Sequence, residues 1–206
     1  MTAPNSGTQP PVPLWNIANA LTMLRIALVP VFVIALLLDA DGLEPHEGAW
    51  RWAAAAIFAA AMITDKIDGD LARAKNLVTD FGKIADPIAD KLLVGAALIM
   101  LSLLGELPWW VTIVILVREL GITLLRMWMI RTQVMPASRG GKLKTLLQAI
   151  GLQLMLLPLS VIAGWLDTLA LWIMIIAAVV TVITGIDYVV QALRIRRAAA
   201  GPKETP

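Results

Sequence analysis

The chain has 206 residues, a length that suits one domain. It is 59% hydrophobic and 16% charged, with a mean hydropathy of +0.78. Soluble domains are about half apolar and about a quarter charged, so the excess of apolar residues indicates a protein that contacts lipid. The net charge of +2 is too small to indicate nucleic-acid binding.

The chain has no cysteine and only one histidine, His46. Disulfides, thiolate catalysis and Cys-ligated metals are therefore excluded, and histidine-based sites are nearly excluded. Carboxylates are the remaining metal ligands, and they favour a hard ion such as magnesium or manganese. His46 itself lies in an acidic stretch, where we expect it to be solvated rather than to act as a ligand.

A helix that spans a bilayer needs about 20 mainly apolar residues, and six segments approach this length. In chain order they are residues 20–38, 49–63, 87–104, 109–130, 143–164 and 169–190. The second is short, and we expect its helix to continue towards Arg73. The sequence therefore predicts an all-α integral membrane bundle of six transmembrane helices, with a short N-terminal interfacial helix at residues 14–19.

Polar sequence flanks this predicted bundle at both ends. Residues 1–13 are rich in Pro, Thr, Ser and Gly and contain no Lys or Arg. We therefore expect a disordered tail there rather than a signal peptide, which would need a basic beginning. The membrane domain is then expected over residues 14–197, followed by a flexible C-terminal tail over residues 198–206.

Charged residues divide unevenly between the two sets of loops. Acidic side chains dominate one set, and basic side chains gather in the other set and in the C-terminal tail. The basic residues are Lys66, Arg73, Lys75, Lys83, Arg131, Arg139, Lys142, Lys144, Arg194, Arg196, Arg197 and Lys203. Because positively charged loops stay on the cytoplasmic side, we expect both termini there. Trp109, Trp110 and Trp165 would then lie at the opposite interface.

Four aspartates fall at the cytoplasmic ends of two predicted membrane helices. Asp65 and Asp68 are three residues apart, so they share one face of a helix. Asp86 and Asp90 are four residues apart and share a face of the next helix. Four carboxylates this close would repel one another, and charges within membrane helices usually mark a functional site. One or two divalent cations would relieve the repulsion, and a two-metal clamp suits displacement at phosphorus.

The residues around these aspartates suit a phosphate ligand. Gly69 and Ala72 are small enough to let a ligand approach the helix backbone. Arg73 could pair with a phosphate in a bidentate manner. Gly82 precedes the second pair of aspartates, where a side chain would obstruct the same pocket. Asp86–Pro87 resembles a helix start, because proline is favoured at the first helical position.

The pattern D-x2-D-G-x2-A-R-x8-G-x3-D-x3-D runs from Asp65 to Asp90 without a gap. It is the signature of the CDP-alcohol phosphatidyltransferases, so the chain resembles that family. Further segments are similar to bacterial phosphatidylglycerophosphate synthases, the actinobacterial type most closely. They are N-I-A-N-A-L-T-M-L-R-I-A-L-V-P (16–30), D-P-I-A-D-K-L-L (86–93), V-R-E-L-G-I-T-L-L-R (117–126) and G-K-L-K-T (141–145). One departure is Ala85, a packing position where the family pattern has a larger apolar residue.

The resemblance implies a multi-pass enzyme of the bacterial plasma membrane, with its active site on the cytoplasmic side. Family members transfer the phosphatidyl group of CDP-diacylglycerol to an alcohol and release CMP by a one-step, in-line displacement. In the resembled group the alcohol is sn-glycerol 3-phosphate. A homodimer is also implied.

The resemblance also implies roles for individual residues. Two Mg²⁺ or Mn²⁺ ions would be held by Asp65, Asp68, Asp86 and Asp90. Asp90 would in addition act as general base on the acceptor hydroxyl. The residues expected to bind CDP-diacylglycerol are Gly69, Ala72, Arg73, Thr79 and Gly82.

An acceptor with two negative charges needs a basic pocket, for which the candidates are Arg118, Arg126, Arg139, Lys142 and Lys144. Arg118 lies well inside an apolar segment, where a buried cation needs a partner or a ligand. Glu119 is adjacent to it but about 100° away around a helix, so we expect the partner on another helix or in the substrate. Arg126 lies on roughly the same face as Arg118. Lys142 and Lys144 would not both face inward, and we rank Lys144 first.

Other interpretations remain open. Phosphatidylinositol phosphate, phosphatidylserine and CDP-using cardiolipin synthases share the aspartate motif and differ in the acceptor. A divalent cation transporter would also explain buried carboxylates, although Arg73 and Arg118 do not suit a cation path. The basic residues at 139, 142 and 144 are also typical of surface charge that meets anionic lipid. Metal-dependent release of CMP separates the enzyme from the transporter.

Overall fold

The computed structural model describes residues 16–46, 48–74, 79–129 and 139–199. Within these ranges the chain is helical apart from turns and one short β-hairpin, which confirms the all-α prediction. The elements are α1 (Ile17–Asp39), β1 (Ala40–Asp41), β2 (Glu44–Pro45), α2 (Ala49–Ala74), α3 (Asp80–Leu103), α4 (Trp109–Met129), α5 (Arg139–Leu156), α6 (Leu159–Ile162) and α7 (Trp165–Ala199).

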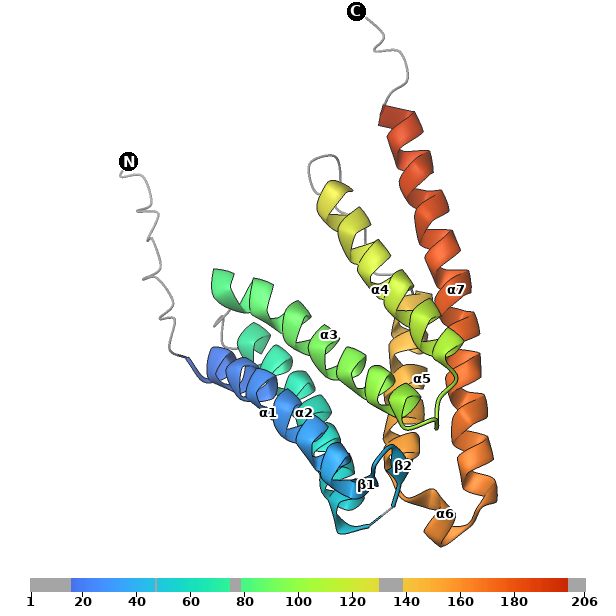
Figure 1. Cartoon of the computed structure of the whole chain (residues 1–206). Helices are drawn as coiled ribbons and strands as arrows, with labels where there is room; N and C mark the ends of the chain where they lie inside the picture. Colours follow the sequence, from blue (N-terminus) through green and yellow to red (C-terminus); the bar gives the residue numbers. More distant parts are fainter. Residues whose placement is uncertain (1–15, 47, 75–78, 130–138, 200–206) are drawn as a thin grey trace, which may run out of the picture.

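The long helices run between two ends of a bundle (Figure 1). α1 and α2 lie side by side with α3 packed mainly against α1, and α4, α5 and α7 form a second group. The β-hairpin, α6 and the turn between α3 and α4 lie at one end, which we call the hairpin end. The opposite end carries the end of α2 and the beginnings of α1 and α3, and we call it the motif end.

An apolar core joins the two groups of helices. Phe32 of α1 and Phe58 of α2 are fully buried, and their ring centroids are 5.9 Å apart. Leu98 of α3 and Leu152 of α5 belong to the same buried cluster. Small side chains on α2 let its neighbours approach closely. The buried ones in this cluster are Ala54, Ala55 and Ala61.

Large apolar side chains cover much of the outer surface. Val117 and Leu124 of α4 are each 65% exposed, and Ile183 of α7 is 60% exposed. Among the described residues, α1 and the stretch Trp165–Arg196 are long and apolar enough to cross a membrane by length and composition. The other four long helices each contain at least three Asp, Glu, Lys or Arg residues. Six spans therefore stay a prediction, whereas a helical bundle with an apolar exterior is observed.

Two predicted helix boundaries are wrong, and proline explains one of them. α3 begins at Asp80, not at Asp86–Pro87, because the side chain of Thr79 caps it by accepting a hydrogen bond from Gly82 N. Pro87 therefore lies inside α3. The predicted segment 143–164 is divided, since Pro158 follows the end of α5 and cannot continue its hydrogen bonding.

The end of α2 agrees with the prediction, and α1 begins earlier than the predicted membrane segment. α2 continues beyond the apolar segment as far as Ala74, as predicted. Residues 17–19, which were expected in an interfacial helix, form the first turn of α1, and residues 14 and 15 lie outside the described ranges.

Arg51 connects three parts of the hairpin end. Its guanidinium forms an ion pair with Glu106 in the turn between α3 and α4. It also donates hydrogen bonds to the carbonyl oxygens of Met155, at 2.6 Å, and Leu156, at 3.1 Å, where α5 ends. The side chain is only 2% exposed, so these contacts are almost completely shielded from water. Arg51 thus holds α2, α5 and the α3–α4 turn together.

We expect Arg51→Leu to destabilise the fold, because it removes a buried charge partner from Glu106 and two donors from the end of α5. Loss of one member of a buried ion pair costs on the order of 3 kcal/mol. Thermal unfolding of the purified protein in detergent measures this change. Arg51→Lys should have an unfolding temperature between those of the original protein and Arg51→Leu. An unchanged unfolding temperature in Arg51→Leu would contradict the role of Arg51 in holding the hairpin end together.

Candidate active site

The aspartate motif lies at the motif end, on the last turns of α2 and the first turns of α3. Asp65 and Asp68 lie on helical backbone in α2, and Asp86 and Asp90 lie on helical backbone in α3, as the spacing predicts. The side chains of Asp65, Asp86 and Asp90 are partly buried. Several predicted site residues have side chains outside the described part of the structure: Asp68, Ala72, Arg73, Arg126 and Arg139.

α1 presents a row of buried polar side chains to this motif. Asn19, Thr22 and Arg25 follow one another at intervals of three residues, so they share a helix face, and none is more than 5% exposed. Thr22 Oγ1 donates a hydrogen bond to Asp86 Oδ1 at 2.5 Å. Arg25 Nη1 forms an ion pair with Asp65 Oδ1 at 2.5 Å. α1 thus contacts one aspartate from each pair.

The third member of the row, Asn19, contacts the beginning of α3. Thr79 Oγ1 donates a hydrogen bond to Asn19 Oδ1 at 2.9 Å and accepts one from Gly82 N at 3.0 Å. A Cβ atom on Gly82 would lie 2.9 Å from Asn19 Oδ1 and 3.3 Å from Thr79 Oγ1. Gly82 therefore permits close packing of α3 on α1. The hydroxyl of Thr79, which was expected to contact CDP-diacylglycerol, bonds within the protein.

The aspartates fit a divalent cation by the chemistry of their donor atoms. Carboxylate oxygens are the ligands that hard cations prefer, and each carboxylate has two oxygens that accept several contacts. The contacts from Thr22 and Arg25 engage Oδ1 of Asp86 and of Asp65, and a carboxylate that accepts such a contact can still bind a cation. Among the described residues, no three acidic or histidine side chains lie close enough to form a metal-binding group. The side chain of Asp68 lies outside the described part of the structure.

Asp90 lines a cavity of about 100 Å³ between α3, α4 and α5. Lys144 of α5 and Glu119 of α4 line the same cavity and form an ion pair with each other. Lys144 is only 5% exposed, whereas Lys142 on the same helix is exposed. The prediction that these two lysines do not both face inward is confirmed. Further polar residues of the lining are Lys91, Thr145 and Gln148.

Arg118 lies on the side of α4 that faces α7, outside the lining of the cavity at Asp90. Its Nη1 donates to Glu119 Oε1 at 3.2 Å, and its Nη2 donates to Thr184 Oγ1 of α7 at 3.3 Å. The expectation that Glu119 would point away is wrong, because two long side chains can bend towards each other across one helical step. Arg118 lines a separate apolar cavity of about 580 Å³ between α4 and α7, beside Gly185. Glu119 thus pairs with both Arg118 and Lys144.

The row on α1 and the ion pairs of Glu119 were not predicted from the sequence. A signal was present for Arg25, because a cation within an apolar segment needs a partner, and Asn19, Thr22 and Arg25 recur at helical spacing. The same signal was present for Glu119, a charge within the predicted apolar segment 109–130, but it does not identify the partner. Its relation to Lys144 depends on how α4 and α5 pack, which the spacing of residues does not contain.

The chain matches the CDP-alcohol phosphatidyltransferase family over residues 15–199. It is 55% identical over 179 residues to a probable phosphatidylglycerophosphate synthase of Mycobacterium tuberculosis. The aligned region covers 87% of this chain and 82% of the relative. It is 40% identical over 184 residues to the CDP-diacylglycerol–glycerol-3-phosphate 3-phosphatidyltransferase of Bacillus subtilis, and the aligned region covers 85% of this chain and 94% of the relative. The Rickettsia felis protein of that name is 40% identical to this chain over 176 residues, and the aligned region covers 84% of this chain and 93% of the relative.

Substitution of Gly82 tests the packing of α3 on α1. Gly82→Ala should lower the free energy of unfolding by about 1 kcal/mol, since the new methyl group would displace the Asn19 side chain. Gly121→Ala is the matched control, because a Cβ atom there meets nothing within 4 Å. It should be neutral or stabilising, since alanine is the better helix former. Equal thermal stabilities of the two variants would contradict this account of Gly82.

Proposed function

Because the chain belongs to the CDP-alcohol phosphatidyltransferase family, we propose that it transfers the phosphatidyl group of CDP-diacylglycerol to sn-glycerol 3-phosphate. The products are phosphatidylglycerophosphate and CMP, and the reaction belongs to phospholipid biosynthesis. The observation that carries this proposal is the complete aspartate motif, together with 40–55% identity to relatives named for this reaction.

The family is generally dependent on divalent metal ions, and the motif supplies suitable ligands. In the proposed site, two Mg²⁺ or Mn²⁺ ions would be held by Asp65, Asp68, Asp86 and Asp90. When bound, these ions would neutralise negative charge on the pyrophosphate and on the departing CMP. Gly69, Ala72 and Arg73 are the proposed contacts of the nucleotide, on the last turns of α2. Gly82 would contribute by keeping the start of α3 close to α1.

Asp90 is the proposed general base, and its place in the lining of the cavity supports this role. One carboxylate oxygen of Asp90 would accept the proton of the acceptor hydroxyl. The hydroxyl oxygen then forms a bond to the phosphorus that carries the diacylglycerol group. The bond from that phosphorus to the bridging oxygen of the pyrophosphate breaks, and its electron pair leaves with CMP.

Lys144 is the best-placed candidate for the acceptor phosphate, because it lines the same cavity as Asp90. Its ammonium group pairs with Glu119, which also pairs with Arg118. Arg118 would therefore influence the acceptor through Glu119 rather than by contact. Arg126 and Arg139 remain proposed acceptor ligands on α4 and α5. Lys142 is the weakest candidate, since its side chain is exposed.

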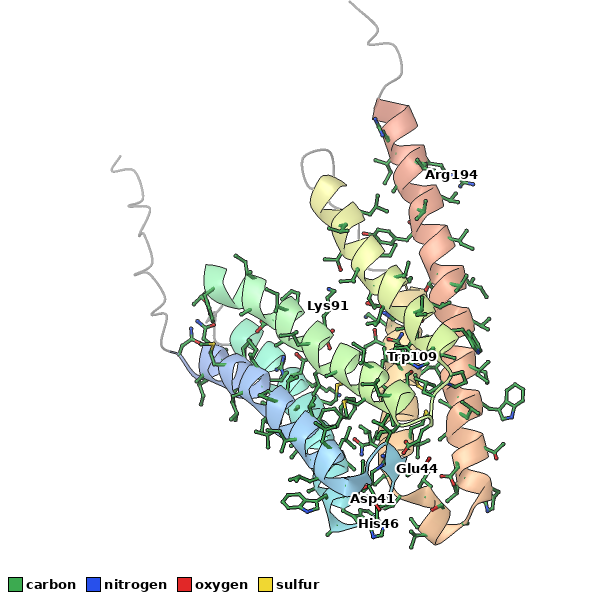
Figure 2. All side chains as sticks on the ribbon, viewed as in Figure 1. Asp41, Glu44, His46, Lys91, Trp109 and Arg194 are labelled. Carbon is green, nitrogen blue, oxygen red and sulfur yellow. The ribbon has the colours of Figure 1, made fainter. Side chains whose placement is uncertain are left out.

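The proposed setting is the bacterial plasma membrane, with six spans, a homodimer, and both termini and the motif end on the cytoplasmic side. The charge distribution supports this orientation. Figure 2 shows Asp41, Glu44 and His46 together at the hairpin end, whereas Arg194 lies towards the far end of α7. Trp109, Trp110 and Trp165 begin α4 and α7 on the hairpin side, and each is at least 47% exposed.

The activity test uses the purified full chain in detergent with CDP-diacylglycerol and Mg²⁺. CMP release is measured with glycerol 3-phosphate, inositol 1-phosphate, serine or phosphatidylglycerol as acceptor. We expect CMP only with glycerol 3-phosphate, and we expect Asp90→Asn to abolish it. Asp187→Asn is the control, because Asp187 is an exposed aspartate on α7 bonded to Gln191. Release with inositol 1-phosphate instead would overturn the acceptor, and no release with any acceptor would overturn the reaction.

A pair of lysine variants tests the acceptor pocket. Lys144→Gln should raise the KM for glycerol 3-phosphate by about tenfold or more, because a charged hydrogen bond to the phosphate is lost. Lys142→Gln removes an exposed lysine two residues away and should change this KM by less than about twofold. The KM for CDP-diacylglycerol should stay constant in both. Equal effects of the two variants on the glycerol 3-phosphate KM would contradict the assignment of Lys144.

A further inference from the structure

The polar row on α1 has no part in the aspartate motif, yet it contacts both helices that carry the motif. Thr22 and Arg25 are each 1% exposed, within a helix whose only other polar or charged residues are Asn19 and Asp39. Burying a hydroxyl or a guanidinium is unfavourable unless each finds a partner. Here the partners are Asp86 of α3 and Asp65 of α2, one from each aspartate pair.

We propose that Thr22 and Arg25 are positioning residues that fix the orientation of Asp86 and Asp65 for divalent cations. The inference rests on the proposed function, because it concerns the same aspartates. Neither residue would touch the substrate or the cation. Each would act by holding one oxygen of a carboxylate, so that the carboxylate does not rotate away from the cation. Partners of this kind orient metal ligands in many proteins.

Thr22 shows the positioning contact most clearly. A hydroxyl has one proton to donate, and the oxygen of Asp86 lies 2.5 Å away, whereas the carbonyl oxygen of Ala18 lies 3.1 Å away. The bond engages Oδ1 of Asp86, and Oδ2 is the atom that faces the backbone of Gly82, 3.9 Å from where a Cβ atom would stand. The two oxygens therefore have different environments, since Oδ1 accepts the bond from Thr22 and Oδ2 lies towards Gly82.

Arg25 adds a charge to the same arrangement. Its guanidinium is buried, whereas the side chain of Asp65 is 41% exposed at the motif end. The pair therefore holds a partly exposed carboxylate from the protein side and leaves its outer side accessible. The positive charge beside Asp65 also reduces the repulsion between this carboxylate and the other aspartates of the motif when no cation is bound. Any substitution of Arg25 by a neutral residue changes this charge as well as the orientation, so Thr22 is the cleaner probe.

The experiment measures Mn²⁺ binding to the purified full chain in detergent, without substrates, by electron paramagnetic resonance. Thr22→Val keeps the size of the side chain and removes only the hydroxyl. We expect it to raise the Mn²⁺ dissociation constant roughly tenfold, as the loss of an outer partner of a metal ligand does. Thr22→Ser restores the hydroxyl and should return the constant to within about twofold of the original protein.

Thr112→Val is the matched control. Thr112 is also 1% exposed, and its hydroxyl bonds to Ser102 at 2.7 Å and to the carbonyl oxygen of Leu98 at 3.2 Å, far from the motif. Loss of the Thr112 hydroxyl should lower thermal stability about as much as Thr22→Val does, but it should leave the Mn²⁺ affinity unchanged. If Thr22→Val does not fold, Thr22→Ala removes the same donor without the second methyl group. A Mn²⁺ constant in the folded Thr22 variant equal to that of Thr112→Val would overturn the proposal.

Activity provides the second readout and separates this inference from the proposed function. In CMP release, Thr22→Val should raise the Mg²⁺ concentration for half-maximal rate by a similar factor, while the rate at saturating Mg²⁺ falls less. If the original protein binds Mn²⁺ but releases no CMP with any acceptor, the proposed function fails and the binding result still decides the inference. If the original protein binds no Mn²⁺, the positioning role is overturned.

Discussion

Mutual repulsion among carboxylates is the constraint on which the motif end depends. Asp65, Asp68, Asp86 and Asp90 lie on two neighbouring helices within an apolar bundle. Negative charges on helices of an apolar bundle are unfavourable unless positive charge or hydrogen-bond donors compensate for them. α1 supplies part of this compensation with the guanidinium of Arg25 and the hydroxyl of Thr22. Divalent cations supply the rest in the proposed function.

The same constraint explains why small residues lie near the charges. Donors on α1 reach the aspartates only if α1 packs closely against α2 and α3. Gly82 allows this at the start of α3, where a Cβ atom would meet Asn19. The buried alanines of α2 allow it further along the bundle. At the hairpin end, Arg51 holds α2, the end of α5 and the α3–α4 turn together, away from the aspartates.

Much of this arrangement can be predicted from the sequence, because it depends on local spacing. Apolar segments locate the helices, and intervals of three and four residues place the aspartates in pairs on helix faces. Predictions fail where a local rule meets a competing one. Asp86–Pro87 resembles a helix start, but Thr79 offers a capping hydroxyl seven residues earlier, and the first turn of α3 forms there.

Contacts between helices are beyond such reasoning. The charge of Arg118 predicts a partner but not which one, and long side chains allow it to reach Glu119 on its own helix. The pairing of Glu119 with Lys144 depends on the relative placement of α4 and α5. The pairing of Arg25 with Asp65 depends in the same way on α1 and α2. In the proposed function, these contacts would decide which basic residues can contact the acceptor.

The most direct test of the central claim follows the acceptor oxygen. The full chain is incubated with CDP-diacylglycerol, Mg²⁺ and glycerol 3-phosphate labelled with ¹⁸O at its primary hydroxyl, and both products are analysed by mass spectrometry. The account predicts phosphatidylglycerophosphate that retains the label and CMP without it. Phosphatidic acid with unlabelled CMP, and no labelled lipid, would mean that water attacks instead, and this result would contradict the claim that the cavity at Asp90 holds the acceptor.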